Sequence, residues 1–310
     1  MISYWKEMRE NSSFTVPPDL KQHFLRTTDG RQLHVAEVGQ GHPLIFVHGW
    51  PEFWKSWLPV VNFLKSNYRC IMPCLYGFGL SDKPDEIDSR IDADFHASDI
   101  NFIAKKLCIN RPILIGHDVG SYVLQSVGHK NPKNYSGLIF FNCPTASVGR
   151  DWVNYGHVNE IWYQSFHLTD LAQQLVGFNQ HTIRLYIEYF LKHWSYNKSA
   201  FDPVLDDWVE NFSQPNALIG GFSWYKSNNE KRIKTLQGDV DMPLSKISTP
   251  SAILWGKHDP ILKSDWGKFV EAHFDDVFVE YANNSGHFVH VEQPELAMKF
   301  INQNAQKWLI

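Results

Sequence analysis

The sequence has few cysteines, no long apolar run and no surplus of basic residues. Four cysteines in 310 residues form no C-x-x-C pair and have no histidines at zinc-ligand spacing, so we expect neither a disulfide scaffold nor a bound metal. No stretch approaches the roughly 20 apolar residues that span a bilayer. Residues 1–14 hold early acidic residues and no apolar signal-peptide core. We therefore expect a cytoplasmic protein without a membrane partner.

The charges are nearly balanced. There are 29 Lys and Arg residues against 33 Asp and Glu residues, a formal net charge of −4, whereas nucleic-acid binding usually needs a basic face. We therefore expect no nucleic-acid partner. Aromatic residues are plentiful, at 15% with 12 tryptophans, which suits either a large apolar cavity or a well-filled core. The length suffices for one large domain, or for a core with an inserted subdomain.

Short apolar runs alternate with helical segments in the first half and at the end of the chain. The apolar runs occupy residues 43–49, 68–74, 112–118, 135–144, 250–259 and 276–283. Runs that are apolar on both faces are typical of parallel strands buried on both sides, and helical patterns at 95–109 and 119–131 lie between them. Residues 21–39 alternate like a hairpin with Asp29-Gly30 at its turn. The pattern predicts the fold class α/β, a mostly parallel sheet flanked by helices.

This alternation stops in the second half of the chain. From residue 145 to 243 the pattern is helical, for example at 181–194, where apolar residues recur every three or four positions. A helical block that interrupts an α/β alternation predicts a cap over the carboxyl ends of the strands, where such sheets bind ligands. We therefore expect three segments, namely a first part of the core at 1–144, the cap at 145–243 and a second part of the core at 244–310.

One short motif has the outline of a hydrolase nucleophile turn with a different residue at its centre. Residues 115–121 read IGHDVGS, so Asp118 stands where the pattern G-x-S-x-G has its serine. An apolar run precedes the motif and a helical segment follows it, as a strand–turn–helix elbow requires. Asp259, after a late apolar run, and His287, before the final helix, complete the order nucleophile, acid, histidine. Each residue alone has an ordinary structural explanation, but the three in this order predict a catalytic triad.

Two further motifs extend this pattern: an H-G-x-P sequence and a G-x-G-x-S loop, formed by His48-Gly49-Trp50-Pro51 and by Gly77, Gly79 and Ser81. With these motifs the chain resembles, over nearly its whole length, the α/β-hydrolase superfamily, and within it the epoxide hydrolases and their dehalogenase relatives. The resemblance implies an α/β-hydrolase fold with an inserted helical cap and no cofactor. It also implies that Asp118 is the nucleophile, that Asp259 and His287 are the acid and the base, and that the Trp50–Pro51 bond is cis.

An aspartate nucleophile suits attack on a saturated carbon. A carboxylate that attacks such a carbon forms an ordinary alkyl ester, whereas attack on an acyl carbon would form an anhydride. Asp118 is ionised at neutral pH without help, so His287, oriented by Asp259, is needed only to activate the water that hydrolyses the ester. The oxyanion of that second step would lie between the backbone N–H groups of Trp50 and Val119.

Two tyrosines in the predicted cap favour an epoxide as the substrate. An epoxide oxygen leaves as an alkoxide and benefits from a positioned acid. Tyr163 lies 45 residues beyond Asp118, and Tyr225 lies in the W-Y-K segment at 224–226; the epoxide hydrolases that the chain resembles carry two cap tyrosines in similar settings. We expect Tyr163 and Tyr225 to be the ring-opening acids, the alternative being that both only pack the cap.

A haloalkane or haloacetate dehalogenase with the same nucleophile is the alternative enzyme. Val119 stands where haloalkane dehalogenases often place a tryptophan, and no arginine directly follows the nucleophile as it does in fluoroacetate-type enzymes. Tyr163-Gln164 occupies the place of their halide-binding His-Trp pair. A non-enzymatic receptor of this fold usually lacks catalytic groups, and none is missing here. A lipase or esterase would need a serine in place of Asp118.

The predicted reaction converts a small hydrophobic epoxide and water into a vicinal diol, and it makes the protein a hydrolase that acts on ether bonds. Phe53, Trp162 and Trp224 are candidate substrate contacts, or else parts of the apolar core. The sequence leaves a homodimer open.

The chain departs from the family pattern at three places. Cys74 and Tyr76 stand where the G-x-G-x-S loop commonly has an acidic and a basic residue, and we expect altered support of that loop without altered chemistry. Asn142 lies where some relatives place the triad acid, and because it carries no charge the acid must be Asp259.

Overall fold

One mixed sheet forms the centre of the molecule. The structure, a computed structural model, describes residues 17–239 and 245–309; the N-terminal segment 1–14 and the predicted cap end at 243 lie outside this part. The eight strands are β1 (Lys21–Arg26), β2 (Gln32–Val38), β3 (His42–Val47), β4 (Tyr68–Pro73), β5 (Ile113–His117), β6 (Gly137–Phe141), β7 (Ser251–Gly256) and β8 (Val277–Ala282). Their order in the sheet is β1-β2-β4-β3-β5-β6-β7-β8.

The strand pairing follows from the burial pattern of the sequence. β2 runs antiparallel to its neighbours β1 and β4, and all other neighbours are parallel. β5, β6 and β7 are buried along their whole length because both faces are covered, whereas the edge strands β1 and β8 are partly exposed. The predicted α/β sheet is thus confirmed. The predicted hairpin is also present, with Gly30 at φ +92° and its N–H donating to the Thr27 carbonyl at 3.2 Å.

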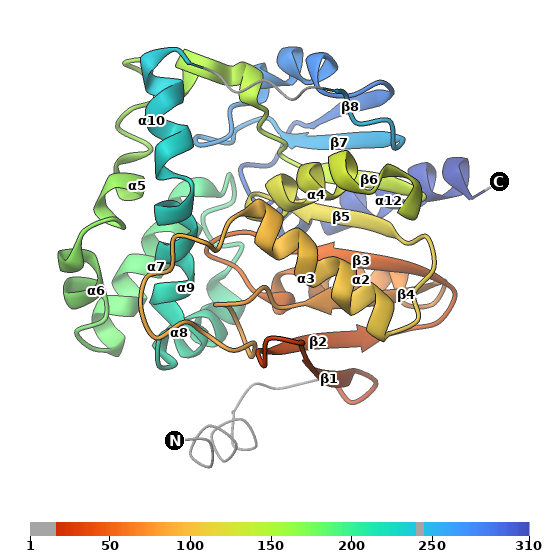
Figure 1. The fold of residues 1–310 in the computed structure, drawn as a ribbon, viewed down its shortest axis with the longest axis horizontal. Helices are drawn as coiled ribbons and strands as arrows, with labels where there is room; N and C mark the ends of the chain where they lie inside the picture. Colours follow the sequence, from red (N-terminus) through yellow and green to blue (C-terminus); the bar gives the residue numbers. More distant parts are fainter. Residues whose placement is uncertain (1–16, 240–244, 310) are drawn as a thin grey trace.

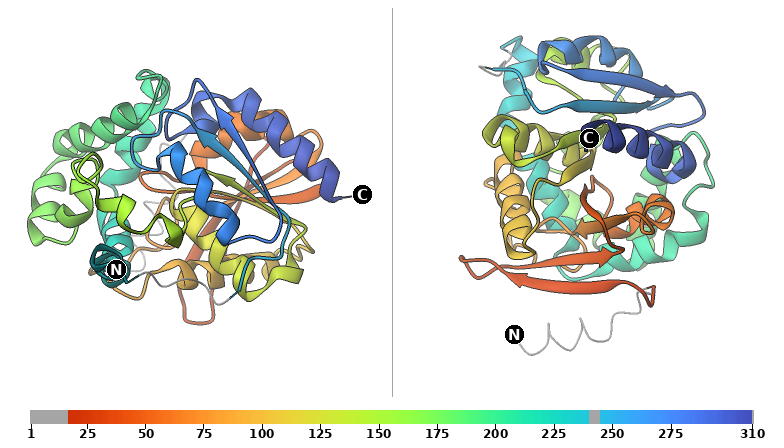
Figure 2. Two further views of the ribbon diagram at one scale, coloured as in Figure 1. Left: turned by 90° about the horizontal axis from the view of Figure 1, so that it is seen from above. Right: turned by 90° about the vertical axis from the view of Figure 1, so that its right-hand side faces the viewer.

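Helices cover both faces of this sheet. α3 and α4 lie together on one face, and α2 and α12 lie together on the other (Figures 1 and 2). The bounds are α2 (Leu58–Leu64), α3 (Ala93–Lys106), α4 (Val119–Lys130), α11 (Val289–Glu292) and α12 (Pro294–Trp308). At the start of α3 the Asp92 carboxylate accepts a hydrogen bond from the Phe95 N–H at 2.9 Å, which satisfies one of the free donors of that helix end.

A group of helices between β6 and β7 lies at the carboxyl end of the parallel strands, on the left in Figure 1. They are α5 (Trp162–Phe166), α6 (Asp170–Val176), α7 (Gln180–Trp194), α8 (Leu205–Ser213), α9 (Ala217–Ser227) and α10 (Asn229–Gln237). Short 3-10 helices are η1 (Trp54–Trp57), η2 (Pro132–Asn134), η3 (Ala146–Val153), η4 (Asp202–Val204) and η5 (Ser264–Ala272). The helical pattern at 181–194 corresponds to α7, which begins with a capping box formed by Asn179 and Thr182.

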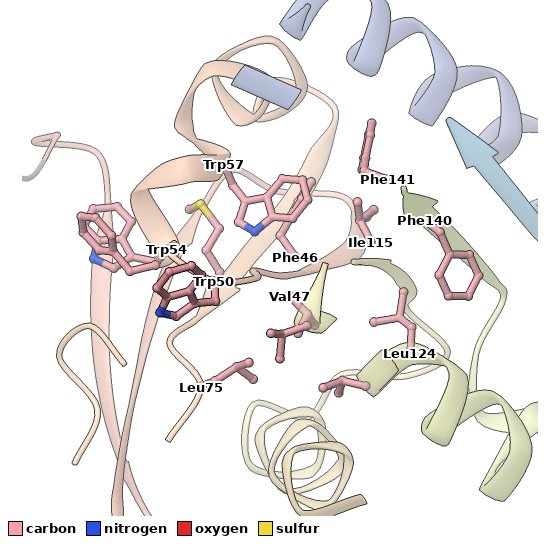
Figure 3. Close-up of a cluster of buried hydrophobic side chains, with 14 of the residues drawn as sticks. Phe46, Val47, Trp50, Trp54, Trp57, Leu75, Ile115, Leu124, Phe140 and Phe141 are labelled. Carbon is pink, nitrogen blue, oxygen red and sulfur yellow. The ribbon is translucent and has the colours of Figure 1, made fainter. Parts of the chain in front are cut away.

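Much of the aromatic content fills the core. Figure 3 shows part of it, where Trp57 packs against Phe46 and Phe141 with ring centroids 5.4 and 5.8 Å apart. Trp50, Trp54 and Trp57 are all at most 2% exposed, so these three indoles contribute to packing and do not form an exposed patch. Within the described part of the chain, no helix has the length and apolar character needed to cross a membrane.

Candidate active site

Asp118 occupies a sharp turn between a strand and a helix. It follows β5 directly and precedes α4, with φ 49° and ψ −111°, a left-handed conformation that is unusual for a residue with a side chain. The flanking glycines make this turn possible. A Cβ on Gly120 would lie 2.1 Å from the Val47 carbonyl oxygen, and one on Gly116 would lie 2.7 Å from the Gly120 carbonyl oxygen. The turn therefore places the Asp118 side chain at the carboxyl end of the sheet.

The residues predicted as a triad come together at this turn. His287 Nδ1 and Asp259 Oδ2 lie 2.8 Å apart, and the other Asp259 oxygen accepts the N–H groups of Ile261 and Leu262 at 2.8 and 2.9 Å. His287 Nε2 lies 3.8 Å from Asp118 Oδ2 and has no hydrogen-bond partner among the described residues. The imidazole thus has one nitrogen held by a carboxylate and the other directed toward the nucleophile.

The charges around His287 determine its protonation. The ring is fully buried, and burial acts to lower its pKa, but the carboxylates of Asp259 and Asp118 raise the pKa of His287 to about 9. While Asp118 is a free carboxylate, His287 is therefore mainly protonated at neutral pH. Removal of the Asp118 charge would favour the neutral imidazole, which is the form that can accept a proton.

Asn142 connects the triad to two strands, a role that sequence reasoning missed. Its amide donates to Asp259 Oδ2 and to the His287 carbonyl oxygen, both at 2.7 Å. Its own oxygen accepts the Gly256 N–H at 2.7 Å. Asn142 follows β6 with φ 54° and is fully buried. Its position directly after a buried strand was a signal, but its partners lie more than 100 positions away and no local pattern shows them.

The backbone N–H of Trp50 holds the other oxygen of Asp118. The Trp50 N–H donates to Asp118 Oδ1 at 2.9 Å, and the Trp50–Pro51 bond is cis. Val119 is the first residue of α4, so its N–H belongs to the free donors of a helix N-terminus. Oδ1 can therefore keep its hydrogen bond from the Trp50 N–H when negative charge gathers on it. Oδ2 lies on the side of His287.

Tyr163 and Tyr225 lie against each other above the nucleophile. Their ring centroids are 5.4 Å apart at 90°, and both line the cavity that Asp118 also lines. Both rings contact the Trp50 indole, with centroids 5.5 and 5.7 Å away. Burial, together with the Asp118 carboxylate, raises the pKa of both hydroxyls above the ordinary value of tyrosine. Both therefore stay neutral O–H donors at physiological pH.

The cavity has a volume of about 290 Å³, close to the lower limit for small-molecule sites. Trp224 lines it, as does Tyr122, which sequence reasoning missed although it lies four residues beyond Asp118 on α4. Phe53 and Trp162 are not among its lining residues. Phe53 packs against Trp208 at 4.9 Å, and Trp162 is 43% exposed. Substrate contact by Phe53 and Trp162 stays a prediction, whereas Trp224 lies at the cavity.

A buried cluster of Glu52, His117 and His290 lies behind the triad. Glu52 accepts hydrogen bonds from the Gly49 N–H and from His117 Nδ1, both at 2.7 Å, and from His290 Nε2 at 2.8 Å. His117 Nε2 lies 2.9 Å from the His287 carbonyl oxygen. Burial acts to raise the pKa of Glu52, yet the two histidines hold it well below its usual value.

The same cluster contains the kinds of atoms that bind metals. Among the described residues, it is the only group of three or more His, Cys, Asp or Glu side chains whose ligand atoms lie within 4.8 Å of one another. The atoms concerned are however already paired at hydrogen-bond distances, and Glu52 also accepts a backbone N–H. The arrangement is that of a closed hydrogen-bond network.

Comparisons with known proteins agree with this geometry. A family model described as the alpha/beta hydrolase fold matches residues 42–294. The mouse protein "Epoxide hydrolase 4" is 26% identical over 90% of this chain and 78% of its own length, and the "Soluble epoxide hydrolase" of Corynebacterium sp. (strain C12) is 25% identical over 90% and 96%. The inhibitor-bound structure of a Bacillus megaterium epoxide hydrolase superposes with a TM-score of 0.78 at 19% identity, over 93% of this chain and 99% of that one.

Proposed function

The chain belongs to the α/β-hydrolase fold family, and from this premise we propose that it is an epoxide hydrolase that opens an epoxide to a vicinal diol through an ester on Asp118. The observation that carries the proposal is the pair of neutral tyrosines, Tyr163 and Tyr225, in the same cavity as an aspartate nucleophile. Relatives named as epoxide hydrolases support the substrate class.

In the first step Asp118 Oδ2 attacks an epoxide carbon. Oδ1 is engaged by the Trp50 N–H, so Oδ2 is the oxygen with the more available electron pair. The new C–O bond forms as the ring C–O bond breaks, and the ring oxygen takes a proton or a strong hydrogen bond from Tyr163 or Tyr225. The product is an alkyl ester of Asp118 that carries the hydroxyl of the opened ring.

In the second step water hydrolyses this ester. Ester formation removes the Asp118 charge, one of the charges that raise the pKa of His287, so the imidazole loses its proton more readily. That proton replaces the one that the tyrosine gave to the ring oxygen. Its Nε2 then takes a proton from water, and the hydroxide attacks the ester carbonyl carbon. The negative charge develops on Oδ1, between the N–H groups of Trp50 and Val119. Collapse breaks the bond to the alcohol oxygen, which takes the proton of the newly added hydroxyl as the diol leaves. Asp118 is then a carboxylate again, and His287 keeps the proton that it took from water.

We further propose that residues 145–243 form the cap of this enzyme. Their helices α5 and α9 carry the two tyrosines, so the segment supplies the acids while the sheet supplies the nucleophile and the base. Small epoxides and water are the proposed reactants, and the proposal requires no cofactor and no particular oligomeric state.

The direct test of the reaction class is product analysis with styrene oxide and, in parallel, with a panel of bromoalkanes and haloacetates. We expect the diol from styrene oxide, and no halide release above that of an Asp118→Ala variant. Halide release without diol formation would assign the chain to the dehalogenases and leave the tyrosine pair without a catalytic role. A Tyr155→Phe variant, altered at a tyrosine that is 93% exposed, is the matched control for later tyrosine substitutions.

A further inference from the structure

A half-buried arginine lines the same cavity as the nucleophile. Arg232 belongs to α10 and is one of the lining residues. Its two terminal nitrogens each donate to Ser165 Oγ at 3.2 Å, and one of them also donates to Asn229 Oδ1 at 3.2 Å. A guanidinium has five N–H groups, so these three hydrogen bonds leave two free. All of the acceptors that it contacts are neutral.

The lack of a charged acceptor distinguishes Arg232 from the other partly buried arginines of the described segments. Those that are likewise partly buried, Arg31, Arg69 and Arg184, each pair with a carboxylate. In those same segments no carboxylate lies within 4.0 Å of the Arg232 guanidinium. Burial lowers the pKa of Arg232 and the neighbouring Tyr163 hydroxyl acts in the opposite direction. The side chain thus loses water contact without the partner that normally compensates for that loss.

The surroundings of Arg232 are positively charged. Lys231 and Lys234 of α10 also line the cavity, and among the described residues Asp239 is the one carboxylate in its lining other than Asp118. The polar wall formed by α10 faces a cavity whose other residues include Trp224, Tyr225 and Ile261. A ligand that fills the space therefore meets aromatic groups beside the nucleophile and cationic groups along α10.

We propose that Arg232 binds a carboxylate on the substrate, so that the preferred substrates are small epoxides that carry an acid group. The inference rests on the proposed epoxide hydrolysis and specifies its substrate class. The two free N–H groups, on Nε and on the outer side of Nη1, lie on different edges of the guanidinium, so a carboxylate would accept one charge-assisted hydrogen bond from a free N–H group. Arg232 also holds Ser165, two residues from Tyr163 on α5, so a bound carboxylate would position the epoxide near the tyrosine pair.

The kinetic test compares para-carboxystyrene oxide with its methyl ester, which has the same ring and epoxide but no charge. We expect kcat/KM to be about tenfold higher for the acid, the effect of one charge-assisted hydrogen bond. Arg232→Gln should remove this preference and Arg232→Lys should keep part of it. Lys299→Gln, altered at an exposed lysine of α12, should leave it intact. Equal kcat/KM values for acid and ester in the wild type, or a preference that survives Arg232→Gln, would overturn the proposal.

A binding measurement separates this inference from the proposed reaction. Calorimetry with para-ethylbenzoate and para-ethylbenzamide, neither of which can be opened, reports the carboxylate site alone. Tighter binding of the benzoate, lost in Arg232→Gln but not in Lys299→Gln, supports the site even if no epoxide is hydrolysed. Equal binding of the two probes contradicts the site even if styrene oxide is converted to its diol.

Discussion

The indole of Trp50 lies parallel to the phenol ring of Tyr163, with centroids 5.5 Å apart and an interplanar angle of 7°. The backbone N–H of the same residue holds Asp118 Oδ1 at 2.9 Å. One residue of the core therefore contacts both the proposed nucleophile and a proposed ring-opening acid. This contact fixes the acid relative to the nucleophile across the boundary between the sheet and the helices above it.

The tyrosine pair should control ring opening and not ester hydrolysis. Tyr163→Phe and Tyr225→Phe should each slow formation of the Asp118 ester, and the double variant should lower its rate by about a hundredfold or more, because no acid then assists the leaving oxygen. Single-turnover kinetics with styrene oxide measures this step, with Tyr155→Phe as the control. A double variant that forms the ester at the wild-type rate would show that the tyrosines only pack the cavity.

Asn142 should affect the rate of ester hydrolysis more than the rate of ester formation. Asn142→Ala removes two donors from the triad and leaves the Gly256 N–H without its acceptor, which should reduce the free energy of unfolding by about 2 kcal/mol. Hydrolysis should slow more than ester formation, since only hydrolysis needs an oriented His287, and the ester should accumulate as a burst. The control Asn304→Ala removes a buried amide on α12 that donates to the Phe300 carbonyl. Equal slowing of both steps would contradict a positioning role.

The buried carboxylate of Glu52 should stabilise the fold through its two histidines. Glu52→Gln weakens the acceptor that His117, His290 and the Gly49 N–H share, and we expect a loss of about 3–5 kcal/mol in the free energy of unfolding. A Glu52→Gln, His117→Gln double variant should recover part of this loss because two neutral amides can hydrogen-bond to each other. Urea denaturation measures both. An unchanged midpoint for Glu52→Gln alone would mean that Glu52 is not ionised in the folded protein.

The raised pKa of His287 gives stability a specific dependence on pH. Because the folded value of about 9 exceeds the ordinary value of 6.5, the contribution is fully present below pH 6.5 and is lost as pH rises through about 9. It amounts to roughly 3 kcal/mol. We expect this decline in the wild type, a smaller one in Asp118→Asn, where one of the raising charges is gone, and none in His287→Gln. The free energy of unfolding measured from pH 6 to 10 checks it; equal slopes in all three proteins would contradict the assignment.

The sheet and the elbow could be predicted from sequence because each depends on local patterns. Strands buried on both faces read as continuous apolar runs, and Asp118 lies between glycines that its turn requires. The contacts of Asn142 and Glu52 could not be predicted in this way, since their partners are brought together only by the sheet. Glu52, for example, meets His290 across 238 positions.

The aromatic residues could not be divided between core and cavity for a related reason. The sequence could not separate core from cavity, so Phe53, which packs against Trp208, was predicted as a substrate contact along with Trp224, which does line the cavity. Arg232 had no signal at all in the sequence, because a charged residue on a polar helix usually faces water. Only the absence of a carboxylate near its half-buried side chain, within the described segments, marks it as unusual.

The most direct test of the account is to trap the ester. His287→Gln should keep the nucleophile and lose the base, so incubation with styrene oxide should add the mass of the whole epoxide to the protein, and peptide mapping should place it on Asp118. The same experiment with an Asp118→Ala, His287→Gln double variant should give no adduct. If the wild type forms the diol while His287→Gln gains no mass, or if the adduct persists without Asp118, the covalent mechanism proposed for this site is wrong.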